Sequence, residues 1–125
     1  MKFRRRVLIL EDDPGTQLLI KKMLLKIDPY LGVVTATTAE SAYFFLNEAI
    51  WDGFKFDLVV ADVNLPGSTG ILLWEVVNKR FHVDFLFISG MPEEKWTEQT
   101  KRFREVPPFL PKPLTEESLR EFWLK

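Results

Sequence analysis

The sequence predicts an α/β protein: a doubly wound, five-stranded parallel sheet covered by helices on both faces. Five short apolar runs alternate with five segments of helical periodicity along the 125 residues. Two of the runs, at 7–10 and 58–61, have no polar alternation, which is typical of parallel strands buried on both faces. Strict alternation of strands and helices implies right-handed crossovers, and therefore strands that run in the same direction.

Length and composition limit the classes of function. A chain of 125 residues with 46% hydrophobic residues can build one core, so we expect a single domain over residues 1–125. The net charge of −1, from 17 basic and 18 acidic residues, argues against nucleic-acid binding. Cysteine is absent, and the apolar runs are too short to cross a bilayer. We therefore expect a cytoplasmic protein that does not contact a membrane.

The first strand is predicted at 7–10, and the acidic run Glu11-Asp12-Asp13 follows it. Asp13 before Pro14 is typical of a helix N-cap followed by the first helical position, where proline needs no N–H. Apolar residues at helical spacing continue this first helix, and Pro29 ends the segment.

A short second strand is expected at 33–36, after Gly32. Thr37 with Glu40 three residues later predicts a capping box for the second helix. The buried stripe of this helix is predicted from four apolar residues: Ala42, Phe45, Leu46 and Ala49.

The third strand is predicted at 58–62 and ends on Asp62, before a Pro66-Gly67 turn. Gly70 is expected to open the third helix. Three of its residues are predicted to face the sheet: Leu73, Val76 and Val77.

The fourth strand is predicted at 85–89, followed by a short, weakly apolar helix with Trp96, Thr100 and Phe103 on one side. The fifth strand is predicted at 109–113. Because Pro111 has no N–H to donate, this strand should lie at a sheet edge. Thr115 is expected to cap the last helix, whose apolar side consists of Leu119, Phe122 and Trp123.

Five chemically active side chains fall at or just past the carboxyl ends of predicted strands: Glu11, Asp12, Asp62, Ser89 and Lys112. The carboxyl ends of parallel strands meet at one edge of a sheet, where ligands bind. Each residue alone is explained as well by a turn, a helix start or a surface charge. Their combination favours one shared cleft.

Crowded carboxylates repel one another unless a cation lies between them, and oxygen ligands of this kind suit Mg²⁺. Four residues are predicted to hold the ion: Glu11, Asp12, Asp62 and Asn64. Asp62 could then act as a carboxylate nucleophile that takes a phosphoryl group. Lys112 would neutralise the phosphoryl oxygens, and the Ser89 hydroxyl would donate to them.

The chain resembles the receiver domain of two-component response regulators, including the single-domain chemotaxis type. Residues 9–14 are similar to the first acidic signature of the family, and 57–67 with Gly70 to its phosphoacceptor motif. Residues 85–90 resemble the strand that carries the hydroxyl, and 109–113 the strand that carries the lysine. The similarity covers nearly the whole chain.

This resemblance implies a flavodoxin-like three-layer fold with strand order 2-1-3-4-5 and a cis bond between Lys112 and Pro113. It implies that a histidine kinase or a phosphotransfer protein phosphorylates Asp62 with Mg²⁺. Ser89 and Phe109 would then form the switch that changes the face built by the fourth helix, the fifth strand and the fifth helix. That face would bind a downstream protein, and we expect it also to serve in a homodimer. The domain would catalyse its own phosphorylation and dephosphorylation, unlike a metabolic enzyme.

Three positions depart from the family pattern. Gly90 stands where the family usually has alanine, and 105–108 replace a Gly-Ala pair. Phe109 matches the aromatic switch position but has no hydroxyl.

Two alternatives stay open. One is a protein-interaction module that keeps the receiver fold but does not switch by phosphorylation, which the stiff 107–108 proline pair would suit. The other is an aspartyl phosphohydrolase. This second alternative is disfavoured because Asn64 occupies the position where such enzymes usually carry a second acid.

Overall fold

The computed structural model describes residues 5–65 and 68–124. Seven strands and five helices follow one another in these ranges. Their bounds are β1 (Arg6–Leu10), α1 (Pro14–Ile27), β2 (Gly32–Ala36), α2 (Ala39–Trp51), β3 (Leu58–Asp62), β4 (Asn64–Leu65), β5 (Ser68–Thr69), α3 (Gly70–Arg80), β6 (Asp84–Ser89), α4 (Glu93–Thr100), β7 (Phe109–Pro111) and α5 (Glu116–Trp123).

Five parallel strands form the main sheet in the order β2-β1-β3-β6-β7. Counted within this sheet, the order is the predicted 2-1-3-4-5, so the predicted fold class is confirmed. The last strand, β7, lies at an edge and ends at Pro111, as expected for a residue without an N–H. The bond between Lys112 and Pro113 is cis, as the resemblance implied.

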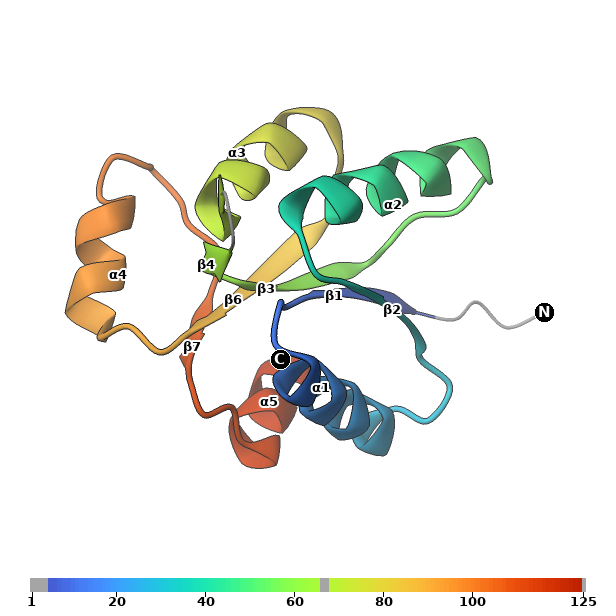
Figure 1. Cartoon of the computed structure of the whole chain (residues 1–125), viewed down its shortest axis with the longest axis horizontal. Coiled ribbons are helices and arrows are strands. Elements are labelled where there is room, and N and C mark those ends of the chain that lie inside the picture. Colours follow the sequence, from blue (N-terminus) through green and yellow to red (C-terminus); the bar gives the residue numbers. More distant parts are fainter. Residues whose placement is uncertain (1–4, 66–67, 125) are drawn as a thin grey trace.

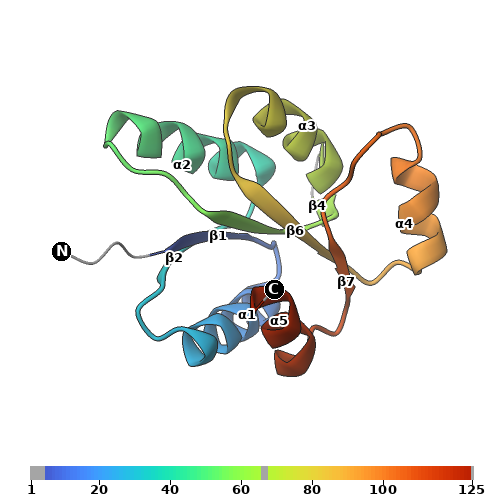
Figure 2. The ribbon, with the colours of Figure 1, turned by 180° about the vertical axis from the view of Figure 1, so that it is seen from behind.

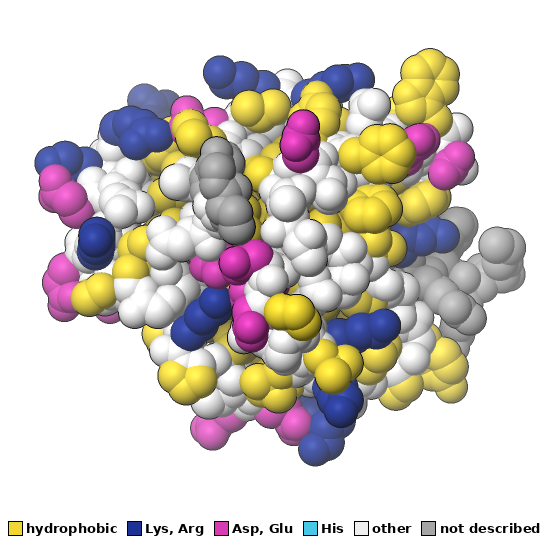
Figure 3. Space-filling model, viewed as in Figure 1, with side chains coloured by type: hydrophobic (Ala, Val, Ile, Leu, Met, Phe, Trp, Pro, Cys, Tyr) yellow, Lys and Arg dark blue, Asp and Glu magenta, His cyan; other side chains and the backbone are white. Residues whose placement is uncertain are grey.

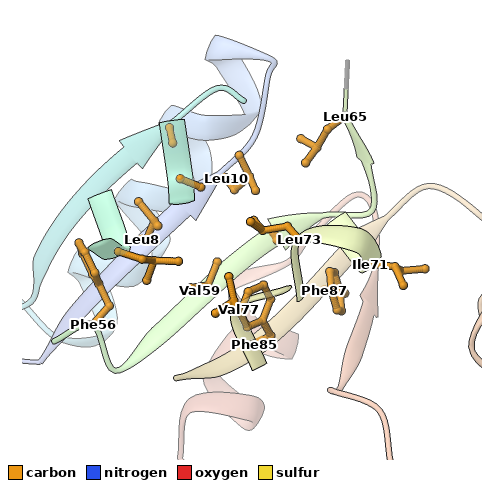
Figure 4. Packing of buried hydrophobic residues seen from close by; sticks show 14 of the residues in the cluster. Leu8, Leu10, Phe56, Val59, Leu65, Ile71, Leu73, Val77, Phe85 and Phe87 are labelled. Carbon is orange, nitrogen blue, oxygen red and sulfur yellow. The ribbon is translucent and has the colours of Figure 1, made fainter. Parts of the chain in front are cut away.

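The unbroken apolar runs are explained by burial on both sides of the sheet. Along β1, Leu8 and Leu10 face one hydrophobic cluster while Val7 and Ile9 face the other, and all four side chains are fully buried. Strand β6 divides in the same way, with Phe87 in the first cluster. Figure 4 shows residues of this first cluster converging from the sheet and from α3.

Two helices cover each face of the sheet, and the fifth lies beside one edge. Figures 1 and 2 show α2 and α3 side by side over one face of the sheet, and α1 with α5 over the other. Helix α4 lies beside the β7 edge, and the side chain of its Trp96 belongs to the first hydrophobic cluster. No helix within the described ranges is long and apolar enough to span a membrane.

Helix starts were predicted with mixed success. The Asp13 side chain accepts a hydrogen bond from the Thr16 N–H, which confirms the N-cap of α1. The predicted capping box of α2 is wrong by one residue, because Thr38 rather than Thr37 caps the helix and accepts from the Ser41 N–H at 3.0 Å. Local composition could not separate two adjacent threonines, since either can supply the capping oxygen.

Two further predictions about helices are corrected. Val76 was expected to face the sheet, but it is 53% exposed, while Leu73 and Val77 are buried. Phe103 lies in a turn beyond α4, and its N–H donates to the Thr100 carbonyl oxygen. The Phe103 ring still packs against the core. Helix α4 is as short as the sequence indicated, with eight residues.

A small antiparallel pair of strands, β4 and β5, was not predicted. It pairs Asn64 with Thr69 and Leu65 with Ser68. The predicted Pro66-Gly67 turn lies outside the described residues. Strands of two residues carry too little periodicity to be read from a sequence.

Candidate functional site

The sheet brings its chemically active residues to one edge. Asp62 is the last residue of β3, Ser89 the last of β6, and Glu11 and Lys112 directly follow β1 and β7. Because the strands are parallel and in register, with Asp62 paired to Ile88, these positions lie at the same end of the sheet. Fold topology, and not sequence proximity, therefore assembles the site.

The Lys112 amine joins two carboxylates from different strands. Its Nζ donates to Glu11 Oε1 at 2.7 Å and to Asp62 Oδ2 at 3.0 Å. The side chains of Glu11 and Asp62 are only 1% and 8% exposed, against 26% for Lys112. Two buried acids thus share one cation, and removing it would leave both without a counter-charge.

The second oxygen of each acid is held by a backbone N–H. Glu11 Oε2 accepts from Asp13 at 3.0 Å, and Asp62 Oδ1 accepts from Asn64 at 3.1 Å. Each carboxylate is therefore oriented at both oxygens, which fixes the direction it faces.

The electrostatics of the site follow from burial and crowding. Burial raises the pKa of Glu11 above its usual value, and the negative charge of Asp62 adds to the rise, while hydrogen bonds from Lys112 and Asp13 oppose it. Burial alone would lower the pKa of Lys112, but its hydrogen bonds to Glu11 and Asp62 outweigh that effect and raise it. Lys112 therefore stays charged, and the acid cluster favours additional positive charge.

Three of the four predicted metal ligands come together. Carboxylate oxygens of Glu11, Asp12 and Asp62 lie within 4.8 Å of one another, and Asp12 is exposed. Three hard oxygen donors beside a polar edge fit a small divalent cation such as Mg²⁺, which keeps part of its water shell. Asn64 lies next to the cluster through its hydrogen bond to Asp62, and its role as a ligand stays a prediction.

Ser89 is fully buried and linked to its neighbours on both sides. Its Oγ accepts from the Met91 N–H at 3.1 Å, and its carbonyl oxygen accepts from the Lys112 N–H at 2.8 Å. Among the described residues, none accepts a hydrogen bond from the Ser89 hydroxyl. The hydroxyl can therefore donate to a new acceptor without losing the bond from Met91.

The other predicted switch residue, Phe109, lies away from the acids. It is half-buried and stacks on Trp96, with ring centroids 5.1 Å apart and planes at 16°. Trp96 in turn packs on Phe87 at 5.1 Å. Phe109 therefore contacts α4 through the Trp96 ring, and Trp96 continues the row of rings to Phe87 in β6.

Gln17 contributes to the site and was not predicted. Its Nε2 donates to the carbonyl oxygens of Glu11 and Ala36, each at 3.2 Å, and so ties the acidic loop to α1 and β2. A polar residue in the first turns of a helix usually faces solvent, so no sequence signal distinguishes Gln17.

A hollow elsewhere on the molecule is lined neither by the acids Glu11, Asp12 and Asp62 nor by Lys112. It has a volume of about 980 Å³ and lies at the opposite end of the sheet, where Asp57 precedes β3 and Asp84 begins β6.

Comparison with known proteins identifies the family. The response regulator receiver domain matches residues 7–123. Over 101 residues, 80% of the chain, the sequence is 34% identical to the transcriptional regulatory protein MalR of Bacillus subtilis, of which it covers 41%. It is 31% identical over 118 residues, 94% of the chain, to the two-component response regulator ARR10 of Arabidopsis thaliana, of which it covers 20%. The chain spans less than half the length of these relatives.

Solved structures agree on the fold. A two component response regulator from Cytophaga hutchinsonii superposes with a TM-score of 0.82 at 19% identity, covering 98% of this chain and 96% of that one. A CheY-like receiver domain protein from Methanospirillum hungatei gives a TM-score of 0.78 at 20% identity, with coverages of 98% and 92%. Since the family match spans residues 7–123, this chain belongs to the response regulator receiver domains of two-component systems.

Proposed function

We propose that this chain is a phospho-receiver, in which Asp62 accepts a phosphoryl group from a histidine kinase or a phosphotransfer protein. The observation that carries the proposal is the shared hydrogen bonding of Asp62 and Glu11 to Lys112 at the carboxyl edge of the sheet. A carboxylate nucleophile flanked by an amine and further acids suits phosphoryl transfer, where positioning and charge neutralisation dominate. Family membership supports the same partners.

Mg²⁺ is the proposed cofactor. Glu11, Asp12 and Asp62 would hold it, with Asn64 as the fourth predicted ligand. When bound, the ion neutralises negative charge on the phosphoryl oxygens. Lys112 supplies a second positive charge there, and the backbone N–H groups of Asp13 and Asn64 keep the acids oriented.

The proposed reaction is a transfer between two covalent carriers. A carboxylate oxygen of Asp62 attacks phosphorus, so that a P–O bond forms as the P–N bond of the donor phosphohistidine breaks. The leaving imidazole keeps the electron pair and takes up a proton. Water later attacks the acyl phosphate, which restores the Asp62 carboxylate and releases inorganic phosphate. The domain acts on its own side chain and turns over no metabolic substrate.

The proposed switch couples Ser89 to Phe109. The Ser89 hydroxyl, free to donate, would move toward the acceptor oxygens of phosphorylated Asp62. Phe109 would then take a more inward position and carry the ring of Trp96 with it. The surface formed by α4, β7 and α5 would change as a result and bind the downstream protein.

The setting of this activity is also part of the proposal. We propose that residues 1–125 act as one receiver domain in the cytoplasm, without contacting nucleic acid themselves. Because the chain spans less than half the length of MalR and ARR10, the output that it controls is proposed only as an interaction with another protein or segment.

Mass spectrometry of the intact protein tests the proposal. After incubation with acetyl phosphate and Mg²⁺, the wild-type chain should gain one phosphoryl adduct, and Asp62→Asn should gain none. Asp52→Asn, which changes an exposed acid at the end of α2, is the matched control and should label like the wild type. Equal labelling of Asp62→Asn and the wild type would refute the assignment.

A further inference from the structure

Asp12 is the member of the acid cluster whose side chain is held least. It is exposed, and no described residue donates a hydrogen bond to its carboxylate, whereas Glu11 and Asp62 are each oriented by Lys112 and by a backbone N–H. An Asp12 oxygen nevertheless lies within 4.8 Å of oxygens from both other acids. Figure 3 shows acidic side chains gathered in the middle of the surface, where β1 leads into α1. The position of the Asp12 carboxylate therefore depends on the backbone that carries it.

The peptide groups on both sides of Asp12 are fixed by hydrogen bonds. Before Asp12, the carbonyl oxygen of Glu11 accepts from Gln17 Nε2 at 3.2 Å. After Asp12, the N–H of Asp13 donates to the Glu11 carboxylate at 3.0 Å, and the carbonyl oxygen of Asp13 accepts from the Gln17 N–H at 2.9 Å. Because each peptide group is planar, holding both of them restricts the two backbone dihedrals of Asp12 and so the direction of its side chain. Gln17 binds the chain on both sides of Asp12.

The Gln17 side chain acts where the hydrogen bonds between β1 and β2 end. The last pair of these strands is Leu10 with Ala36, and the Glu11 N–H still donates to the Ala36 carbonyl oxygen at 3.1 Å. Within the described ranges, no backbone N–H donates to the carbonyl oxygen of Glu11. The two N–H groups of the Gln17 amide donate to the carbonyl oxygens of Glu11 and Ala36, each at 3.2 Å. Gln17 therefore supplies the hydrogen bond that the sheet no longer provides.

Mg²⁺ makes the position of each ligand important. The ion binds oxygen at about 2.0–2.1 Å in near-ideal octahedral geometry, so a displaced carboxylate weakens binding. Residues that hold metal ligands by hydrogen bonds commonly matter for affinity without touching the metal. Glu11 and Asp62 keep their own hydrogen bonds if Gln17 is altered, but Asp12 has only its backbone. Loss of the Gln17 amide would thus release one ligand of the three.

We propose that Gln17 is a positioning residue of the Mg²⁺ site, whose side-chain amide fixes the peptide group between Glu11 and Asp12 and so directs the Asp12 carboxylate at the ion. The inference rests on the proposed function, because it assigns a role within the same site. The Gln17 amide donates to carbonyl oxygens and forms no hydrogen bond with Asp62 or Lys112. Gln17 therefore acts on the affinity for Mg²⁺ and not on phosphoryl transfer once the ion is bound.

A titration with Mg²⁺ followed by amide chemical shifts provides the first test. Gln17→Met keeps the length and the helix propensity of the side chain but removes both N–H donors, so it should weaken Mg²⁺ binding by about tenfold. Tyr43→Phe is the matched control, because it removes a side-chain hydrogen bond between α2 and α3, to Arg80, and leaves the acids untouched. It should bind Mg²⁺ like the wild type. Urea denaturation without Mg²⁺ checks that both variants are folded.

The rate of labelling by acetyl phosphate separates positioning from catalysis. For Gln17→Met, the Mg²⁺ concentration that gives half of the maximal rate should rise about tenfold, in step with the loss of affinity. The maximal rate at saturating Mg²⁺ should stay close to that of the wild type, because Asp62 and Lys112 are unchanged. A lower maximal rate with the half-saturating concentration unchanged would contradict the proposal, since Gln17 would then act on the transfer step.

A double variant tests whether Gln17 acts through Asp12. In the Asp12→Ala background, which lacks the carboxylate to be positioned, Gln17→Met should weaken Mg²⁺ binding little further. If the two substitutions instead weaken binding by the product of their separate effects, Gln17 does not act through Asp12, and the proposal is wrong.

These measurements distinguish failure of the inference from failure of the proposed function. A wild type that binds Mg²⁺ and is phosphorylated, beside a Gln17→Met variant of equal Mg²⁺ affinity, overturns the role of Gln17 alone. A wild type that binds no Mg²⁺ overturns the proposed cofactor and the inference together. Equal weakening in Gln17→Met and Tyr43→Phe also overturns the inference, because the loss would then come from general destabilisation of the fold.

Discussion

Lys112 is the residue on which the site depends, because its amine holds two buried carboxylates at once. Glu11 and Asp62 are 51 residues apart in the chain, and Lys112 follows Asp62 by a further 50 residues. The residue types were enough to predict this group from the sequence, since strand ends supply an acid pair, a further acid, a hydroxyl and a lysine. The hydrogen bonds that orient the acids, and the contribution of Gln17, depend on backbone geometry that no residue pattern specifies.

Asp12 is the exposed member of the acid cluster, so its removal tests the proposed metal site. Asp12→Ala should weaken Mg²⁺ binding, because it removes an oxygen donor from a cluster of three. Mg²⁺ should raise the melting temperature of the wild type by relieving repulsion among the acids, and it should have little effect on Asp12→Ala. Asp13→Asn is the matched control, since asparagine caps a helix about as well as aspartate and Asp13 lies outside the cluster. Equal Mg²⁺ stabilisation of Asp12→Ala and the wild type would rule out its role as a ligand.

A variant of Ser89 is expected to separate phosphorylation from switching. Ser89→Ala should still bind beryllofluoride at Asp62 but lose the change in α4, β7 and α5, because the hydroxyl that would follow the new acceptor is missing. Amide chemical shifts of residues 93–123, with and without beryllofluoride, measure this directly. Large and identical shifts in Ser89→Ala and the wild type would show that the hydroxyl does not couple the site to this surface. No shift in either protein would favour the interaction module that does not switch.

The tightest packing between β3 and α3 occurs where α3 begins. Gly70 starts α3 directly beside the end of β3, and its N–H donates to the Val63 carbonyl oxygen at 2.7 Å. A Cβ at Gly70 would collide with the backbone carbonyl oxygen of Asp62 and lie 2.9 Å from Phe87 Cε1. Only glycine therefore allows the helix to start this close to the proposed acceptor residue.

Gly70→Ala should lower the free energy of unfolding by about 1–3 kcal/mol, the usual cost of overpacking a well-packed position. The matched control is Gly90→Ala, because a Cβ there meets nothing within 4 Å. Urea denaturation should find Gly90→Ala close to the wild type. Unchanged stability of Gly70→Ala would mean that β3 and α3 separate more readily than their packing indicates.

The contact between α1 and α5 should depend on pH. Hydrogen bonding to Lys26, 3.1 Å away, lowers the pKa of Glu116, and Arg120 lowers it further. A carboxyl whose pKa is lower in the folded state stabilises the fold at neutral pH and loses this contribution as pH falls through its folded-state pKa. Glu116→Gln should therefore melt slightly below the wild type at pH 7, with a gap that closes in acid and narrows in high salt.

The neighbouring acid supplies the control for this pair. Glu117 is exposed and forms no ion pair with a described residue, so Glu117→Gln should leave the pH profile of the melting temperature unchanged. A gap between Glu116→Gln and the wild type that persisted at acidic pH would mean that glutamine disturbs α5 by another route.

The elements also show which features a single sequence can specify. Apolar runs at 7–10 and 58–61 predicted buried central strands because β1 and β3 do face hydrophobic clusters on both sides. Val76 was misplaced because its apolar character says nothing of the direction it faces. In the structure, the Val76 side chain points largely to solvent.

Across the whole molecule, the proposed site and the covering helices occupy different parts of the sheet. Parallel strands gather Glu11, Asp62 and Lys112 at one edge of the sheet, while helices cover its two faces. The sheet order was predictable because alternating strands and helices, together with Pro111 at an edge, leave few topologies. The stacking of Phe109 on Trp96 was not predictable from the sequence, because it depends on how β7 and α4 pack.

The central claim is that Asp62 carries the phosphoryl group, and locating the acyl phosphate within the wild-type chain tests it most directly. Borohydride reduces an aspartyl phosphate to homoserine, so the modified residue can be identified in fragment spectra after treatment with acetyl phosphate and Mg²⁺. The predicted result is homoserine at position 62, absent when Mg²⁺ is removed by chelation. Reduction at Glu11, Asp12 or Asp13 with residue 62 unchanged, or reduction at no acid, would contradict the account.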